Sequence, residues 1–161
     1  METMDRQAVI AKLAEALMRR GWFVTCAESC TGGGIATALT DLAGSSRWFD
    51  RAFVTYSNAA KHEMLGVSDA TLDEWGAVSR ATVIEMAQGA LALSAAQLAV
   101  AVSGIAGPGG GSTDKPVGTV WLAWATETGA EAVEQHFAGD RLAVRAATID
   151  AALRGLLQRA L

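Results

Sequence analysis

A serine in a short polar segment that runs into three glycines is the first candidate for chemistry in this sequence. The segment reads Glu28-Ser29-Cys30-Thr31, and Gly32-Gly33-Gly34 follows it directly. Glycines let the backbone approach a ligand closely, and the start of a helix offers unpaired N–H groups to negative charge. The segment therefore predicts a place for a phosphate or an oxyanion. A purely structural role, with Ser29 or Thr31 capping the helix, is an equally good interpretation.

A lysine is the second candidate. Lys61 lies in the first turn or so of a short helix that Ser57 or Asn58 could cap. The helix macrodipole disfavours a cation at that end, so the neutral amine costs less there and could act as a base. The alternative is an ordinary solvated lysine. Tyr56, the only tyrosine of the chain, ends the preceding strand, where packing is its simplest role.

Two later segments could contact an anion. The loop from Gly104 to Lys115 is rich in glycine, but it does not fit the G-x-x-x-x-G-K-[ST] pattern, which excludes a P-loop ATPase. Arg141 and Arg145 lie one turn apart at the start of the last helix, where the macrodipole again opposes positive charge. This placement indicates an anionic partner. The alternative is a surface ion pair with Asp140 and neighbouring carboxylates.

Other kinds of site do not fit the residue spacing. The two histidines, His62 and His136, are isolated, so neither a serine–histidine triad nor a metal-ligand cluster is expected. Cys26 and Cys30 match neither a zinc knuckle nor a redox pair, and we expect two reduced thiols. Ser29 belongs to neither a G-x-S-x-G elbow nor an S-x-x-K motif.

Helices and buried strands alternate along the chain, and these elements must position the candidate residues. Apolar spacing predicts strands over 22–27, 51–56 and 98–102 and a hairpin of 117–126 with 130–137. Helices are predicted over 5–20, 32–42, 58–66, 83–91 and 140–160. The pattern predicts a single domain, 1–161, with a three-layer α/β/α sandwich and a mixed, mostly parallel sheet of about five strands. The loops after the first three strands would then line one crevice.

Composition narrows the partners and the compartment. The chain has 161 residues, 51% of them hydrophobic, and a formal net charge of -4. This balance lacks the basic footprint of a nucleic-acid-binding protein. No apolar run approaches the ~20 residues that span a bilayer, and the acidic start Met1-Glu2-Thr3-Met4-Asp5 is unlike a secretory signal, so we expect a cytoplasmic protein with no membrane partner. Trp121 and Trp124, in one strand, fill the core or cover the interface of a homodimer.

Four ordered blocks of the sequence resemble the CinA carboxy-terminal domain family, also described as the nicotinamide mononucleotide deamidase family. The blocks are residues 27–33, 56–61, 104–108 with 115–120, and 139–141 with Arg145. The resemblance extends from about Arg6 to Leu156. It implies a mixed-sheet α/β/α sandwich that hydrolyses nicotinamide mononucleotide to nicotinic acid mononucleotide and ammonia, as part of pyridine-nucleotide salvage. It implies no metal and no organic cofactor.

The resemblance also assigns roles to residues. It implies that Ser29 is the nucleophile, Lys61 its general base and Tyr56 an assisting hydroxyl. The substrate-binding positions that we expect are Thr31, Gly32, Gly33, Asn58, Ser103, Gly104, Arg141 and Arg145. Ser103 departs from the family pattern, because many relatives have threonine there, and the larger amino-terminal domain of fused members is missing. Two alternatives stay open: a non-catalytic nucleotide-binding protein, and an accessory protein of competence or the DNA damage response.

Overall fold

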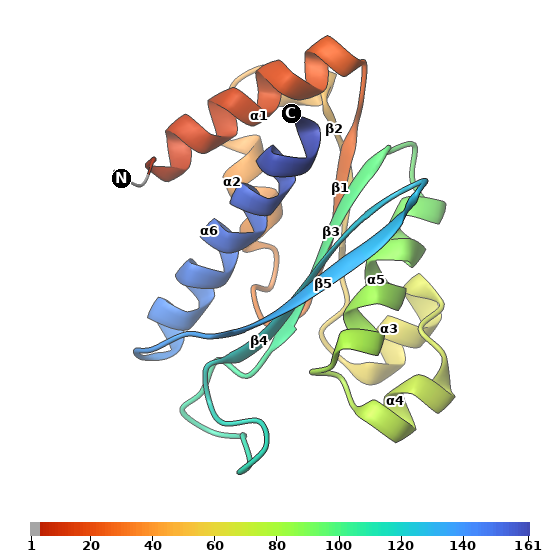
Figure 1. Cartoon of the computed structure of the whole chain (residues 1–161), viewed down its shortest axis with the longest axis vertical. Helices are drawn as coiled ribbons and strands as arrows, with labels where there is room; N and C mark the ends of the chain where they lie inside the picture. Colours follow the sequence, from red (N-terminus) through yellow and green to blue (C-terminus); the bar gives the residue numbers. More distant parts are fainter. Residues whose placement is uncertain (1–3) are drawn as a thin grey trace.

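Five strands form one mixed sheet in the computed structural model, which describes residues 4–161 (Figure 1). The first three residues of the acidic start lie outside this range. The strands are β1 (Val24–Glu28), β2 (Phe49–Val54), β3 (Leu98–Gly104), β4 (Thr119–Thr126) and β5 (Gly129–His136), in the spatial order β2-β1-β3-β4-β5. β1 pairs in parallel with β2 and β3, whereas β4 is antiparallel to both of its neighbours, β3 and β5. The predicted mixed sheet of five strands is confirmed.

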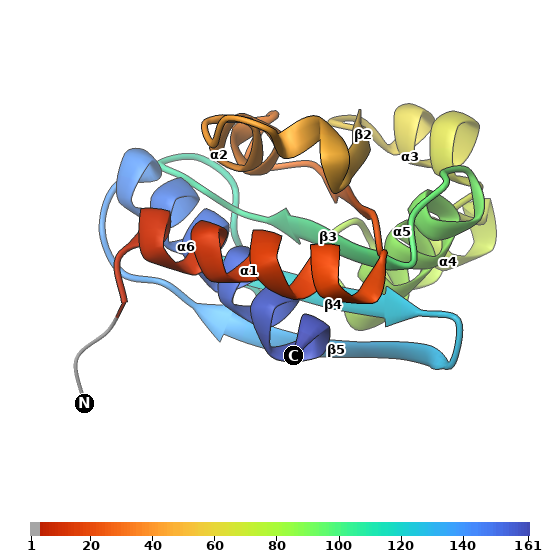
Figure 2. The ribbon, with the colours of Figure 1, turned by 90° about the horizontal axis from the view of Figure 1, so that it is seen from above.

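Helices cover both faces of the sheet and complete three layers. α1 (Arg6–Arg20), α2 (Gly34–Thr40) and α6 (Arg141–Ala160) lie on one face, and α3 (Asn58–Leu65), α4 (Asp69–Trp75) and α5 (Arg80–Ala92) lie on the other (Figure 1). A short 3-10 helix, Ser45–Arg47, precedes β2. Seen from above, α1 and α6 lie next to each other (Figure 2). None of the helices within residues 4–161 is long and apolar enough to cross a membrane.

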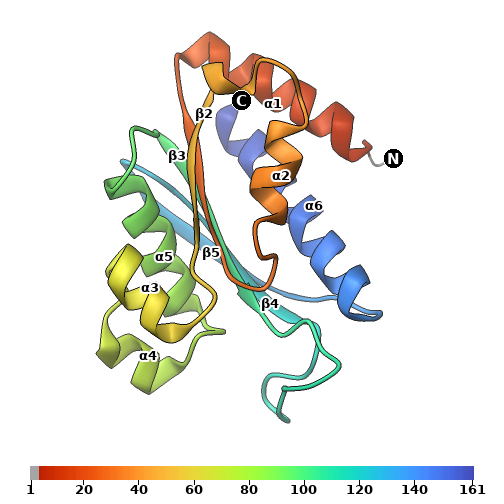
Figure 3. The same cartoon turned by 180° about the vertical axis from the view of Figure 1, so that it is seen from behind.

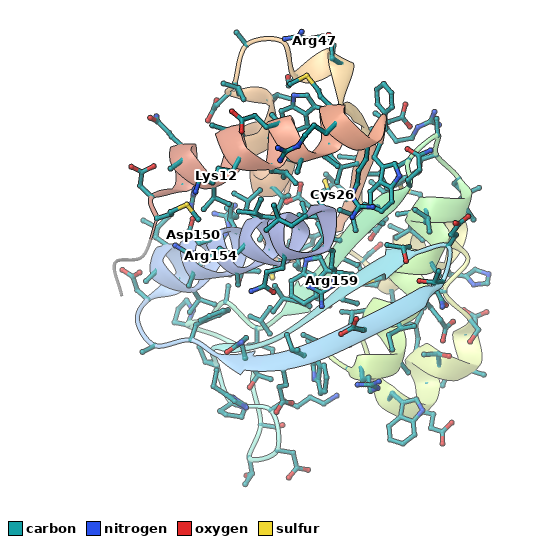
Figure 4. The ribbon with its side chains drawn as sticks, turned by 45° about the horizontal axis from the view of Figure 1, so that its top comes forward. Lys12, Cys26, Arg47, Asp150, Arg154 and Arg159 are labelled. Carbon is teal, nitrogen blue, oxygen red and sulfur yellow. The ribbon has the colours of Figure 1, made fainter. Side chains whose placement is uncertain are left out.

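The two faces of the sheet carry side chains of different size. Leu98, Val100 and Val102 of β3 pack into the larger core beneath α1 and α6. Ala99 and Ala101, which alternate with them, pack on the opposite face with α5. Small side chains let a helix lie close to a sheet, because little volume has to be filled between them. Figure 4 shows Cys26 of β1 in the layer between the sheet and α6.

Local sequence signals explain most of the element boundaries. The Asp5 side chain caps α1, and Gly21, with a positive φ of 66°, ends it, which confirms the helix predicted over 5–20. No element was predicted for the polar stretch before α5, and the structure places α4 there. Ser68 caps that helix and Gly76 ends it. The sequence contained these two helix-end signals. α4 was missed because it buries only Leu72 and has no apolar periodicity.

The two tryptophans of β4 have different environments. Trp124 is buried, and its Nε1 donates to the carbonyl oxygen of Ala152 in α6 at 3.1 Å. The guanidinium of Arg159 lies over its ring, 4.3 Å from the centroid, and Figure 4 shows Arg159 reaching from α6 toward β4 and β5. Trp121 is half-buried on the other face, against the second core. Of these two tryptophans, Trp124 therefore belongs to the core and Trp121 is partly exposed to solvent.

Candidate active site

A cavity of about 270 Å³ lies at the carboxyl ends of β1, β2 and β3. These three strand ends lie at the same edge of the sheet, where the long loop between β3 and β4 also projects (Figure 3). The cavity is lined by Ser29, Cys30, Tyr56, Lys61, Ala77, Val78, Ser103, Gly104, Ile105, Ala106, Gly107, Gly109 and Arg141. The predicted crevice between the loops that follow the first three strands is confirmed.

The Lys61 Nζ atom lies 3.0 Å from the Ser29 Oγ atom, at the wall of this cavity. Parallel pairing causes this meeting, because Glu28 at the end of β1 is in register with Val54 at the end of β2. The chain after β2 turns at Ser57, whose side chain caps α3, and the fourth residue of that helix is Lys61. Both side chains are buried, with exposures of 7% for Ser29 and 1% for Lys61.

The hydrogen bonds of Lys61 suit a protonated amine, which has three N–H donors for three oxygen atoms, and equally a neutral amine whose lone pair faces the serine. Besides Ser29 Oγ, the Nζ atom contacts two backbone carbonyl oxygens, those of Thr55 at 2.9 Å and Tyr56 at 3.2 Å. A carbonyl oxygen can only accept, so these two contacts use both N–H donors of a neutral amine. The lone pair is then left for the hydroxyl proton of Ser29. That hydroxyl lies closer to Nζ than to its other acceptor, the Tyr56 carbonyl oxygen at 3.5 Å.

Burial shifts the protonation equilibrium of Lys61 toward the neutral amine. Loss of solvent lowers the pKa of Lys61 below its usual value of 10.5, and the neighbouring Cys30, when ionised, opposes that shift. Burial in turn raises the pKa of Cys30 to about 11, so this thiol is neutral near pH 7. Among the ion pairs of residues 4–161, none includes Lys61. Lys61 is therefore a buried amine with a lowered pKa and no ion-pair partner among residues 4–161.

The loop after β1 places the backbone amide of Cys30 next to the serine. Within the described chain, the Cys30 N–H has no acceptor oxygen, and Cys30 lines the cavity. The sequence predicted that the N–H groups at the start of α2 are free to bind a phosphate or an oxyanion. This is wrong for Ile35 and Ala36, because their amides donate to the Glu28 carboxylate at 2.8 and 3.0 Å. They are not free for a phosphate. The capping alternative is wrong as well, because the N-cap of α2 is Gly33.

The two arginines of α6 have different partners. Arg141 lines the cavity and donates to the Gly107 carbonyl oxygen at 2.9 Å and to the Tyr56 hydroxyl at 3.2 Å. Arg145 lies behind the loop after β1, where it donates to the carbonyl oxygens of Cys30 and Thr31, both at 3.1 Å. Neither arginine forms an ion pair with a described carboxylate, so the surface-pair interpretation is wrong. Only Arg141 faces the space where a substrate could bind.

The other expected site residues divide into those at the cavity and those away from it. Ser103 and Gly104 line the cavity, and so does Tyr56, which contacts the pair through its carbonyl oxygen. The Tyr56 hydroxyl instead accepts from Arg141, and the side chain is 62% exposed. Five expected residues do not line the cavity: Arg145, described above, and Thr31, Gly32, Gly33 and Asn58.

One part of the cavity wall could not be expected from the sequence. Ala77 and Val78, between α4 and α5, close one side, and no polar or glycine-rich signal marks them. Val78 also lines a larger and mostly apolar hollow of about 640 Å³, together with Trp75 and Trp121. The Ser29 and Lys61 side chains do not line this hollow, so the reactive groups belong to the smaller cavity.

Within residues 4–161 there is no group of three or more His, Cys, Asp or Glu side chains that could hold a metal ion.

The fold and the site together define a class: three-layer α/β/α proteins with a buried serine–lysine pair at the carboxyl ends of parallel strands. The family can be named from comparisons with known proteins. The family model of the CinA C-terminal domain matches residues 6–160. This chain belongs to that family, as its four sequence blocks indicate.

Relatives and solved structures agree with this assignment. The chain is 62% identical over 135 residues to the nicotinamide-nucleotide amidohydrolase PncC of Enterobacter agglomerans, covering 83% of this chain and 82% of that protein. It is 54% identical over 149 residues to the protein of the same name from Escherichia coli K12, covering 92% and 90%. The crystal structure of the competence/damage inducible protein CihA from Agrobacterium tumefaciens has a TM-score of 0.94 at 48% identity, covering 98% of this chain and 97% of that one.

Proposed function

We propose that this protein is a nicotinamide-nucleotide amidohydrolase that uses Ser29 as its nucleophile and Lys61 as its base. The observation that carries the proposal is the 3.0 Å contact between Lys61 Nζ and Ser29 Oγ inside the cavity. Relatives at 54–62% identity over most of the chain bear the name of this activity. A serine hydroxyl is a weak nucleophile unless a neighbouring base takes its proton, and a buried neutral lysine provides such a base.

The first half of the reaction forms a bond between serine and substrate. Ser29 Oγ attacks the carboxamide carbon while its proton passes to Lys61 Nζ. The carbonyl oxygen becomes negative, and the backbone N–H of Cys30, which follows the nucleophile directly and lines the cavity, is the candidate donor to it. When the tetrahedral intermediate collapses, the carbon–nitrogen bond breaks and Lys61 returns the proton to the leaving nitrogen. Ammonia departs, and an ester to Ser29 remains.

The second half restores the enzyme with a water molecule. Lys61, again neutral, takes a proton from the water as its oxygen attacks the ester carbon. The ester bond breaks, and the proton on Lys61 passes to Ser29 Oγ. The product is the carboxylic acid of the nucleotide, which loses its remaining proton to solvent and leaves as the carboxylate. The same amine therefore acts once as base and once as acid in each half. Two carbonyl oxygens hold two of its N–H groups, and the third site on Nζ stays free to take up or release the proton.

Arg141 is the best candidate for the phosphate of the nucleotide. It is the arginine that lines the cavity, and its present partners are a carbonyl oxygen and a hydroxyl, which a phosphate could replace as acceptors. Arginine binds phosphate through charge-assisted and often bidentate hydrogen bonds. The phosphate would thus hold the far end of the substrate while the ring amide lies at Ser29. A cavity of about 270 Å³ favours a mononucleotide over a dinucleotide.

Removal of the serine hydroxyl tests the proposal. Purified protein and the Ser29→Ala variant are incubated with nicotinamide mononucleotide, and both ammonia and nicotinic acid mononucleotide are measured. We expect stoichiometric formation of the two products by the unchanged protein and a loss of at least about 10³-fold in the variant. Ser46→Ala, at an exposed serine, is the matched control and should keep full activity. Substrate binding by calorimetry without ammonia release in the unchanged protein would favour the non-catalytic alternative.

Location and assembly belong to the same proposal. Two buried free cysteines suit the reducing cytoplasm, where disulfides are rare. A homodimer stays a prediction with weaker support, because Trp124 is in the core and only Trp121 is half-buried. Light scattering on the purified protein decides the oligomeric state. The absence of a nucleic-acid partner, expected from the net charge of -4, is checked by a salt-titrated gel shift.

A further inference from the structure

Glu28, the last residue of β1, has a fully buried carboxylate that the proposed reaction does not use. Its Oε1 atom accepts from Thr31 Oγ1 at 2.5 Å and from the Ile35 amide at 2.8 Å. Its Oε2 atom accepts from the Ala36 amide at 3.0 Å and, more weakly, from Cys26 Sγ at 3.7 Å. No ion pair of residues 4–161 includes this carboxylate. Its acceptor capacity is therefore directed to the loop and helix that follow it.

These contacts close a short loop that contains the nucleophile. Thr31 lies inside the segment 29–33, and Ile35 and Ala36 are the second and third residues of α2. The N-cap position, Gly33, has no side chain to satisfy those amides, so Glu28 reaches across the loop to do it. The carboxylate thus fixes both where α2 begins and where the middle of the loop lies relative to the end of β1.

The loop would be mobile without such contacts. Gly32 and Gly33 have positive φ values of 59° and 104°, and glycine has the largest conformational freedom of any residue. Arg145 holds the opposite side of the loop through the carbonyl oxygens of Cys30 and Thr31. The loop is therefore fixed by a carboxylate on its N–H and hydroxyl side and by a guanidinium on its carbonyl side.

We propose that Glu28 is a positioning residue for the reaction, which holds Ser29 Oγ and the Cys30 N–H in place relative to Lys61 Nζ. The proposal rests on Ser29 being the nucleophile. Lys61 is held independently, by two carbonyl oxygens at the end of β2, so only the serine side of the pair depends on Glu28. A misplacement of about 1 Å between reacting groups can cost roughly 10²-fold in rate, because the reacting atoms must meet at near-contact distance.

A role in stability alone predicts a different result. If Glu28 only caps α2, its replacement lowers the folded fraction and leaves the turnover of each folded molecule unchanged. If Glu28 positions the serine, kcat falls at temperatures where the variant is fully folded, while KM changes little, because Arg141 and the loop after β3 lie outside its contacts. The split between kcat and KM therefore separates the two roles.

The test uses Glu28→Gln, which keeps the size of the side chain but replaces one acceptor oxygen with an NH₂ group. At least one of the present donors then faces a donor. We expect kcat for nicotinamide mononucleotide to fall by roughly 10- to 100-fold and KM to stay within about three-fold, measured well below the melting temperature. The matched control is Leu13→Ala, at a fully buried position of α1 in the large core, which lowers stability but should keep kcat.

A second variant covers the case in which Glu28→Gln does not fold. Thr31→Val removes one hydroxyl from the loop and leaves the amides of α2 bound to Glu28. We expect a fall in kcat of about five-fold or more with an unchanged pH profile, because the base is untouched. If Glu28→Gln folds and its kcat is unchanged, the positioning role is overturned. If only Thr31→Val folds, an unchanged kcat in that variant overturns it. If Ser29→Ala keeps activity, the proposed function itself has failed, and this result is separate from the other two.

Discussion

Replacement of Lys61 by methionine separates the chemistry of the amine from its packing. Methionine has nearly the same length, so the buried volume stays filled while the base disappears. The Ser29 hydroxyl then keeps only the Tyr56 carbonyl oxygen at 3.5 Å, which is an acceptor of hydrogen bonds and too weak a base to remove its proton. General base catalysis contributes typically 10²- to 10⁴-fold, and we expect kcat of Lys61→Met to fall by at least about 10²-fold.

The same substitution has two opposing effects on stability. The carbonyl oxygens of Thr55 and Tyr56 lose their donor, and a buried unsatisfied group costs about 1–3 kcal/mol. The unfavourable burial of an amine disappears at the same time, which offsets part of this cost. A net loss of about 1–3 kcal/mol leaves a domain with a typical stability of about 5–15 kcal/mol folded. Lys61→Met should therefore stay folded, and its loss of activity can be measured on the folded protein.

The pH dependence gives this prediction its sharpest form. The pKa of Lys61 is lowered in the folded chain, so between that value and its ordinary value of 10.5 the unfolded chain binds the additional proton. Stability then rises with pH across this window, and the cost of burying the amine is greatest below the folded pKa. kcat/KM should rise with pH through the same lowered pKa, because only the neutral amine accepts a proton. Lys61→Met should lose both dependences.

The assay combines ammonia release with urea unfolding, each measured from pH 6 upward in steps of one unit. Lys12→Met is the matched control, because Lys12 is an exposed lysine of α1 on the opposite side of the sheet from α3, and Figure 4 labels it. It should keep full activity and the pH dependence of the unchanged protein. Activity of Lys61→Met within about ten-fold of the unchanged protein would refute the assignment of Lys61 as the base.

Two further predictions test substrate binding and packing. Arg141→Met should lower kcat/KM for nicotinamide mononucleotide by roughly 10- to 100-fold through KM, because a charge-assisted hydrogen bond contributes about 1.5–3 kcal/mol. The phosphate-free riboside should be unaffected, and an equal loss with both compounds would contradict a phosphate role. Gly155→Ala should lower the free energy of unfolding by about 1–3 kcal/mol despite the better helix propensity of alanine, because its methyl group would overlap the buried Trp124 ring. Urea unfolding measures this loss, and a stabilised variant would show that the ring can move.

Short sequence patterns predicted most of the helices and strands. The end of β1 near Glu28, the cap at Ser57 and the helix end at Gly66 follow from neighbouring residues, because caps and strand periodicity depend on a few positions. β2 spans Phe49–Val54, so its predicted range of 51–56 was wrong by two residues at each end. α4 escaped prediction because it buries a single leucine, Leu72, and periodicity is the signal on which helix prediction mainly depends.

The candidate site divides in the same way. Ser29 and Lys61 were candidates because each lies between a strand and a helix or at the start of a helix, and the family resemblance supplied their roles. The roles of Arg145 and Glu28 were not, because both depend on partners that only the folded chain supplies. Arg145 donates to carbonyl oxygens more than a hundred residues away in sequence, and backbone acceptors leave no mark on side-chain patterns.

The sequence by itself determined the fold class, the strand ends that carry polar residues and the family to which the chain belongs. Each of these follows from residue types at short spacing. The tertiary structure decided that a lysine amine lies 3.0 Å from a serine hydroxyl, that two carbonyl oxygens use its donors, and that a carboxylate occupies the helix start expected to bind phosphate. Those facts depend on strand register and on desolvation, which are set by how distant segments pack and not by the residues next to each group.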